Sequence, residues 1–178
     1  MKYVIYLISI ILLLGINLGL FTQIPLKGQI PNLLFLFALC ASLEKKDFDF
    51  FFISFVCGAF LDFYSTGFFG GFTLAFLTVS LCMHLVASNI LVMEFNWKTL
   101  SAALAVSLLT VDIILCLYGF MAFKFNWTSG YTGFKIIMSG FIPSLVYNGL
   151  LLYPVYLFSN FVKRTLDNFR VRSRGVIR

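Results

Sequence analysis

Long apolar blocks without a single charge are the feature that most constrains this chain. The stretch from Tyr3 to Phe21 carries no charged residue, and neither does the stretch from Phe72 to Met93. A block of roughly 18 or more such residues is long enough to cross a hydrocarbon core about 30 Å thick as a helix. The blocks therefore predict an integral membrane protein.

The overall composition leads to the same class. Hydrophobic residues make up 61% of the 178 residues, and charged residues only 11%. Soluble domains are about a quarter charged, so this chain has too little charge to cover a surface that faces water. We expect one transmembrane helical domain over residues 1–162 and a basic tail over residues 163–178, with no separate soluble catalytic domain.

Apolar segments along the chain predict an all-α, polytopic transmembrane helical bundle of about six spans, with five as an alternative. The segments cover residues 3–22, 30–43, 48–64, 72–93, 99–123 and 136–161. The second segment is short, about 21 Å if it is helical. It either crosses with the help of flanking residues or is re-entrant. Pro31 near its start suits the first turn of a helix.

The distribution of Lys and Arg predicts the orientation. With an even number of spans, ten of these residues lie on the side that holds both chain ends, and three lie on the other side. The larger group is Lys2, Lys45, Lys46, Lys98 and the tail residues, and the smaller group is Lys27, Lys124 and Lys135. Because cytoplasmic loops carry an excess of Lys and Arg, we expect both termini in the cytoplasm.

Two aspartates, Asp62 and Asp112, lie inside the predicted spans. Ionisable residues within a bilayer are costly and suggest function. Asn17 falls at nearly the same level, so the first, third and fifth spans are expected to share a polar layer. This layer is either a proton or cation path, or a set of interhelical hydrogen bonds. We favour the hydrogen bonds, because no Lys or Arg lies within the spans as a counter-ion.

Glycines near these polar residues suggest close helix contacts. Gly15 and Gly19 form a G-x-x-x-G pattern, which lets helix backbones approach closely. Together with Gly58, they are candidate positions for contact with the transmembrane helix of a partner. Asp62 precedes a Gly-rich turn that ends at Gly71, and its carboxylate is expected to accept hydrogen bonds from backbone N–H groups there.

No pattern in the sequence predicts catalysis, a metal ion or a cofactor. The chain has no G-x-S-x-G, H-E-x-x-H, Walker A or dinucleotide-binding pattern. Widely spaced cysteines in apolar stretches are typical of packing residues, and we interpret His84 and Asn148 in the same way. The tail suits anionic lipid headgroups and is too short for specific nucleic-acid binding. We therefore expect a non-enzymatic protein.

The order of these features resembles a known family. Pro31 opens the second span, a Gly-x-x-x-Asp segment follows at Gly58 and Asp62, and a turn with Gly67 and Gly70 comes next. Tyr153 to Tyr156 then lie near the end of the last span, ahead of the basic tail. This layout resembles the bacterial rod shape-determining protein MreD family. On that resemblance, Gly58, Asp62, Gly67 and Gly70 correspond to the family signature, and no catalytic residue carries over.

The resemblance implies a multi-pass protein of the bacterial inner membrane that works in the cell-elongation machinery. Its expected partner is MreC, and MreB, RodA and a class B penicillin-binding protein belong to the same machinery, which directs side-wall peptidoglycan synthesis. The alternative is the substrate-binding S component of an energy-coupling factor transporter. Such a component would bind a vitamin or a metal and dock on an ATPase module through a small-residue face, for which Gly15 and Gly19 are a rough equivalent.

Overall fold

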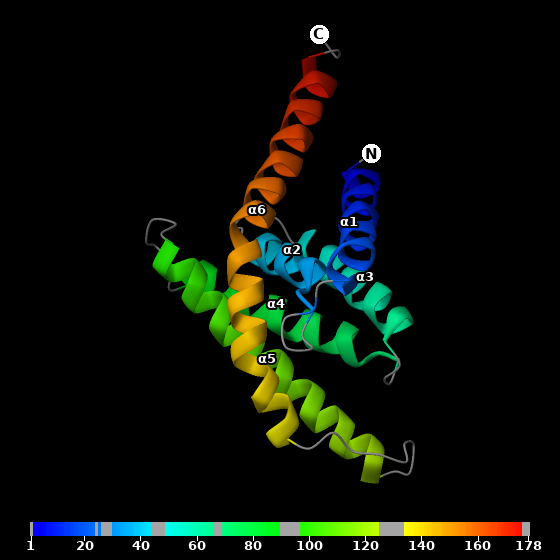
Figure 1. Cartoon of the computed structure of the whole chain (residues 1–178). Helices are drawn as coiled ribbons and strands as arrows, with labels where there is room; N and C mark the ends of the chain where they lie inside the picture. The colour runs from blue at the N-terminus through cyan, green and yellow to red at the C-terminus, as the bar shows by residue number, and fades with distance from the viewer. Residues whose placement is uncertain are drawn as a thin grey trace.

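The protein is helical throughout the part that the structure describes. The computed structural model describes residues 2–23, 25, 30–43, 49–65, 69–89, 97–124 and 134–175, and these residues form no strand. The elements are α1 (Lys2–Gly19), a short 3-10 helix η1 (Phe21–Gln23), α2 (Leu33–Ser42), α3 (Asp49–Tyr64), α4 (Gly71–Asn89), α5 (Trp97–Lys124) and α6 (Phe134–Gly175) (Figure 1). The predicted all-α class is confirmed.

Three helices are long and apolar enough to cross a membrane. The stretches that meet this criterion are Lys2–Gln23, Lys98–Met121 and Gly140–Asn168. Helices α2 and α4 contain shorter apolar stretches, Leu33–Ser42 and Gly71–Ala87. The helices are thus those of a membrane protein, while the number of crossings stays a prediction.

Helix α2 is the buried centre of the bundle. It has 10 residues, all of them buried except Ala41, and it contacts each of the other five α-helices. A helix that is apolar on every side is stable only when it is surrounded. At 1.5 Å per residue it is about 15 Å long, half of the hydrocarbon thickness. The helix begins at Leu33, two residues after Pro31. The prediction that Pro31 lies in the first turn of this helix is therefore wrong.

Helices α3 and α4 form an antiparallel hairpin beside α2. Near the middle of the pair, the Ser54 hydroxyl donates to the Ser80 Oγ at 2.5 Å. Near the end where α3 begins, the ring of Phe50 stacks on His84 with centroids 4.3 Å apart. These two pairs fix the register of the hairpin.

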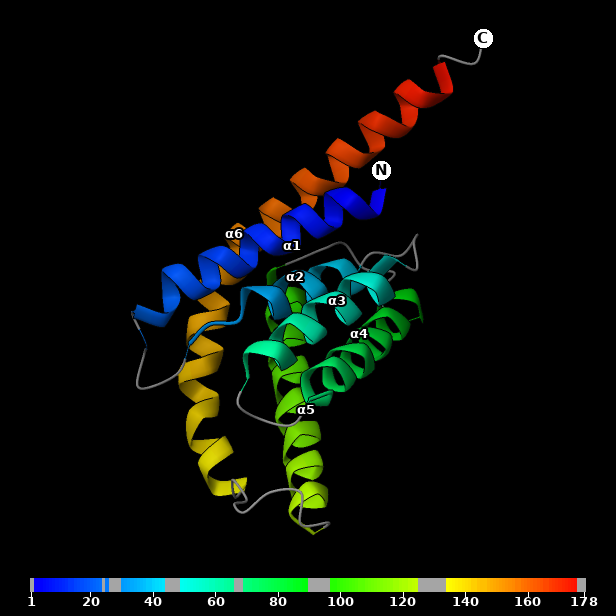
Figure 2. The ribbon, with the colours of Figure 1, turned by 90° about the vertical axis from the view of Figure 1, so that its right-hand side faces the viewer.

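Both ends of the chain lie at the same end of the molecule (Figures 1 and 2). Helix α6 does not stop at residue 162 but continues to Gly175, so the basic segment extends the last helix beyond the bundle. Lys2 at the start of α1 forms an ion pair with Asp49 at the start of α3. The Tyr6 hydroxyl donates to the same Asp49 carboxylate at 3.2 Å. Helices α1 and α3 therefore begin side by side.

Candidate functional site

The Asp62 carboxylate connects the end of α3 to the start of α4. Its Oδ1 accepts a hydrogen bond from the Phe72 backbone N–H at 2.9 Å, and its Oδ2 accepts one from the Thr73 backbone N–H at 3.0 Å. The Thr73 hydroxyl also donates to Oδ2 at 2.5 Å. The side chain is only 3% exposed. The prediction that Asp62 binds backbone N–H groups is confirmed, with donors just after the Gly-rich turn.

The first turn of α4 needs this carboxylate for a local reason. The first N–H groups of a helix have no partner within the helix, and a side chain at the N-cap position usually accepts one of them. Here the N-cap is Gly70, whose carbonyl accepts from Leu74 N–H and which has no side chain to offer. Gly70 also has φ of +99°, a conformation that favours glycine. Asp62 therefore caps α4 from the neighbouring helix, and its negative charge suits the helix N-terminus.

Gly58 lies one helical turn before Asp62, on the same side of α3. A Cβ atom on Gly58 would lie 2.5 Å from the Thr73 Cα and 2.9 Å from its backbone N. Such contacts are with backbone that cannot move aside, so only glycine fits. Gly58 lets the two backbones meet, and Asp62 then reaches the N–H groups of the same turn. We call Gly58, Asp62 and their contacts with α4 the Gly58–Asp62 junction. This junction is the structure that the Gly-x-x-x-Asp segment forms.

Helix α5 holds the turn from its other side. The Tyr118 hydroxyl donates to the Phe69 carbonyl at 3.2 Å, between residues 49 positions apart in the sequence. A Cβ on Gly71 would lie 3.3 Å from the Tyr118 ring, so the ring packs closely on this glycine. Neither Thr73 nor Tyr118 is predicted from the sequence as part of this turn. No neighbouring residue indicates the role of Tyr118, whereas a Thr in the first turn of a helix is a recognisable sign of side-chain hydrogen bonding at the helix start.

Asparagines play the corresponding role at the start of α2. The Asn17 Oδ1 accepts from the Leu33 N–H at 3.2 Å, and the Asn148 Oδ1 accepts from the Asn32 N–H at 2.9 Å. Asn32 is the N-cap itself, and its side chain accepts from the Phe35 N–H at 3.0 Å. Side chains from α1, from α6 and from the residue before α2 thus supply acceptors to one buried helix start. Asn17 and Asn148 are structural residues that satisfy backbone N–H groups out of reach of water.

The polar layer predicted from Asn17, Asp62 and Asp112 is wrong. Helix α5, which carries Asp112, contacts α2, α4 and α6 but neither α1 nor α3 over the described residues. Asp112 is half-buried, and no hydrogen-bond or ion-pair partner is found for it among the residues the structure describes. Asn17 and Asp62 instead serve two different helix starts. Matching depth along separate helices did not bring the three side chains together.

The glycines named as partner contacts differ from one another. Gly15 and Gly19 are exposed on α1, and a Cβ at either position would meet nothing within 4 Å. Gly58 is buried against α4, so the prediction that it offers a surface to a partner is wrong. Gly67 of the family signature lies outside the described residues.

The remaining polar residues of the spans are packed as the sequence predicts. His84 stacks on Phe50, and its Nδ1 lies 3.3 Å from the Ser42 carbonyl at the end of α2. Cys40 and Cys57 are buried free thiols, Cys82 is an exposed one, and Cys116 is a half-buried one. Over the described residues, no three His, Cys, Asp or Glu side chains are placed to hold a metal ion together. The groups assembled at the junction hold helices in position.

No family model, curated protein or solved structure matches the chain. The fold and the junction therefore define its class by themselves. Over the described residues it is a helical membrane protein in which Asp62, Asn17 and Asn148 join the ends of neighbouring helices.

Proposed function

We propose that the chain is a non-enzymatic, multi-pass component of the bacterial inner membrane that binds MreC in the cell-elongation complex. The observation that carries the proposal is the Gly58–Asp62 junction together with Gly70. These are residues on which the resemblance to the MreD family rests, and they form one structural unit. Both oxygens of Asp62 are occupied by hydrogen bonds from α4. A carboxylate whose two oxygens are both occupied in this way supports a structural role for these signature residues rather than a role in a chemical reaction.

The outer face of α1 is the proposed contact for the MreC transmembrane helix. Val4, Ile8 and Leu12 are 57%, 59% and 49% exposed, and Gly15 and Gly19 continue the same side of the helix at helical spacing. Small residues allow close packing between helices in a membrane, and the space over both glycines is open. A second apolar surface, a groove of about 320 Å³ between α3 and α4 that Phe55 and Leu74 help to line, is the competing location.

The proposed topology has about six crossings with both termini in the cytoplasm. Contacts between helix ends support alternating directions. Asn17 near the end of α1 meets the start of α2, and His84 in the second half of α4 meets the end of α2. Helix α6 runs parallel to α2, because Asn148 meets the start of α2 and Phe158 meets Phe37 further along it. Cysteine labelling tests this topology: we expect the tail to be shielded from a membrane-impermeant reagent in intact cells, and labelling of the tail there would contradict it.

Co-purification tests the proposed function. A tagged full-length chain, expressed in a rod-shaped host with MreC, is expected to retain MreC through detergent extraction. Gly15→Leu and Gly19→Leu should reduce that retention by steric bulk while the protein still inserts, because Leu is favourable in lipid. Ala102→Leu is the matched control, since Ala102 is also exposed but lies on α5. Recovery of an ATPase module with a bound vitamin, and no MreC, would favour the transporter alternative.

A further inference from the structure

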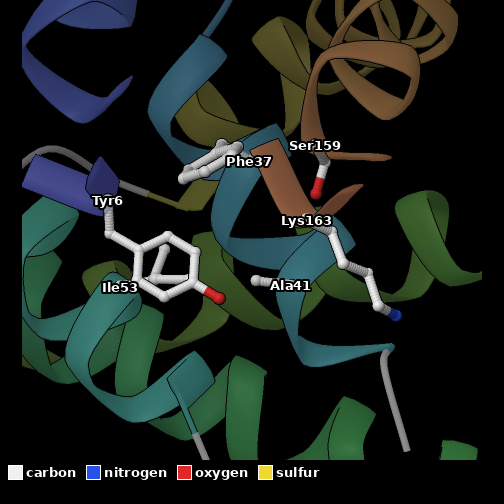
Figure 3. A pocket seen from close by; sticks show the side chains of 6 residues that line it. All are labelled: Tyr6, Phe37, Ala41, Ile53, Ser159 and Lys163. Atoms are coloured by element: carbon white, nitrogen blue, oxygen red, sulfur yellow. The ribbon is translucent and has the colours of Figure 1, made fainter. Parts of the chain in front are cut away.

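A small crevice lies between α1, α2, α3 and α6, toward the end of the molecule that holds both chain ends. It is lined by Tyr6, Phe37, Ala41, Ile53, Ser159 and Lys163 (Figure 3). Its inner volume is about 10 Å³, which is room for about one oxygen-sized group. Figure 3 shows the Tyr6 and Ser159 hydroxyls near the space beside Ala41, with the Lys163 side chain at its edge.

Ser159 is the unusual residue of this crevice. Its side chain is only 8% exposed, yet its hydroxyl has no hydrogen-bond partner among the residues the structure describes. Other buried helical serines have a partner: Ser9 donates to the Ile5 carbonyl, Ser107 to the Leu104 carbonyl, and Ser54 to the Ser80 hydroxyl. Because a buried hydroxyl without a partner is unfavourable, Ser159 is suited to donate to an acceptor that enters from outside.

Charges around the crevice favour an anionic acceptor. Lys163 lies at the mouth, and Arg164 follows it on α6. Among the described acids, Asp49 is engaged by the ion pair with Lys2 and by the Tyr6 hydroxyl, and Asp167 is exposed one turn beyond Lys163 on α6. A hydroxyl donor at the base and an ammonium group at the mouth match the oxygens of a phosphate, which accept charge-assisted hydrogen bonds.

The surroundings of the crevice favour a lipid as the carrier of that phosphate. An exposed apolar stripe runs along the outward side of α6, away from the crevice, and marks how far the apolar part of the helix extends; it ends two residues before Lys163, and its members are Ile142, Val146, Leu150, Tyr153, Leu157 and Phe161. The crevice thus lies where the apolar part of α6 gives way to its basic part. Basic pockets between transmembrane helices at this level are typical binding sites for anionic headgroups.

We propose that the crevice binds the phosphate of an anionic phospholipid. One phosphate oxygen enters and accepts a hydrogen bond from the Ser159 hydroxyl. The Lys163 ammonium holds the phosphate at the mouth, and the acyl chains lie in the apolar layer of the bilayer below it. The site requires a membrane but not the elongation complex, so it stands independently of MreC binding.

Native mass spectrometry of the purified full-length protein tests the site. Phosphatidylglycerol is titrated against phosphatidylcholine with the same acyl chains, for the wild type and for Ser159→Ala and Lys163→Gln. We expect phosphatidylglycerol to bind at least about fivefold more tightly, and each substitution to weaken it by about three- to tenfold. The controls Ser101→Ala and Lys124→Gln, which change exposed residues outside the crevice, should stay within about twofold.

Folding is monitored separately from binding. Ser159→Ala should leave the lipid-free Tm unchanged or slightly raised, because the hydroxyl it removes has no partner. Equal binding of the two lipids would overturn the proposal, and so would displacement of phosphatidylglycerol by inorganic phosphate at equal concentration. An effect of Lys163→Gln without one of Ser159→Ala would also overturn it, because general charge attraction would then explain the binding.

Discussion

Two glycine-containing regions of this molecule look alike in sequence and differ in structure. On α3, Gly58 is pressed against the backbone of α4, with no space for even a methyl group. On α1, Gly15 and Gly19 face open space. Both patterns place a small residue one turn from another small or polar residue. The glycine on α3 allows two helices of the bundle to pack together, whereas the glycines on α1 leave an exposed surface that no other helix in the described part of the bundle covers.

The difference shows what a small residue in a membrane helix can be for. A glycine inside the bundle is required by its neighbour, so changing it should damage folding. A glycine on the outside is not required by the fold, so changing it should damage only what binds there. Substitutions that separate stability from association test this distinction directly.

The largest effect is expected at Gly58. Gly58→Ala forces a Cβ into the Thr73 backbone, and overpacking of this kind costs about 1–3 kcal/mol or more; Gly58→Leu should prevent folding. Gly15→Ala is the matched control and should be neutral or stabilising by up to about 1 kcal/mol, as Ala favours helix. Thermal unfolding of the purified variants in detergent measures both. An equal Tm for Gly58→Ala and the wild type would remove the distinction between the two regions.

Asp62 is expected to give the next largest effect. Asp62→Leu leaves the Phe72 and Thr73 N–H groups without acceptors, at a cost of about 1–3 kcal/mol for each buried donor. Asp62→Asn keeps one acceptor oxygen and should lose roughly half as much. Protein abundance, Tm and cell shape in complemented cells are the measurements. If Asn and Leu were equally inactive at normal abundance, the ionised carboxylate would have a role beyond capping α4.

Asn17→Ala tests whether the start of α2 depends on its neighbours. The substitution removes the acceptor for the Leu33 N–H, and loss of a helix cap costs about 0.5–2 kcal/mol. Asn168→Ala, at an exposed position near the end of α6, should change the Tm little. A Tm as high for Asn17→Ala as for this control would show that α2 does not rely on α1 for its cap.

The smallest effect is expected at Tyr118. Tyr118→Phe keeps the ring on Gly71 but removes the hydrogen bond to the Phe69 carbonyl, worth about 0.5–1.5 kcal/mol. Tyr118→Ala should be more destabilising because the ring contact is lost as well. Equal effects of the two variants would mean that the hydroxyl, and not the ring, holds the turn against α5.

The sequence predicts much of this fold because apolar blocks and turn residues are local signals. It gives the helical class, the approximate helix positions and the bonding of Asp62 to nearby backbone N–H groups. It does not give the short, fully buried α2, because an apolar run looks the same whether lipid or protein surrounds it. It also groups Asp112 wrongly with Asp62, because depth along a helix says nothing about which helices touch. Gly58 and Gly15 cannot be distinguished for the same reason.

Site-specific photo-crosslinking in cells tests the central claim, that the junction is architectural and the face of α1 that holds Gly15 and Gly19 binds the partner. A photoreactive phenylalanine derivative replaces Leu12 on that face, Phe55 in the α3–α4 groove, or Leu150 on α6, all exposed positions. We predict an MreC adduct from position 12 that is lost when Gly15→Leu is added, and none from positions 55 and 150. Adducts only from position 55 or 150, or none from position 12, would contradict the account.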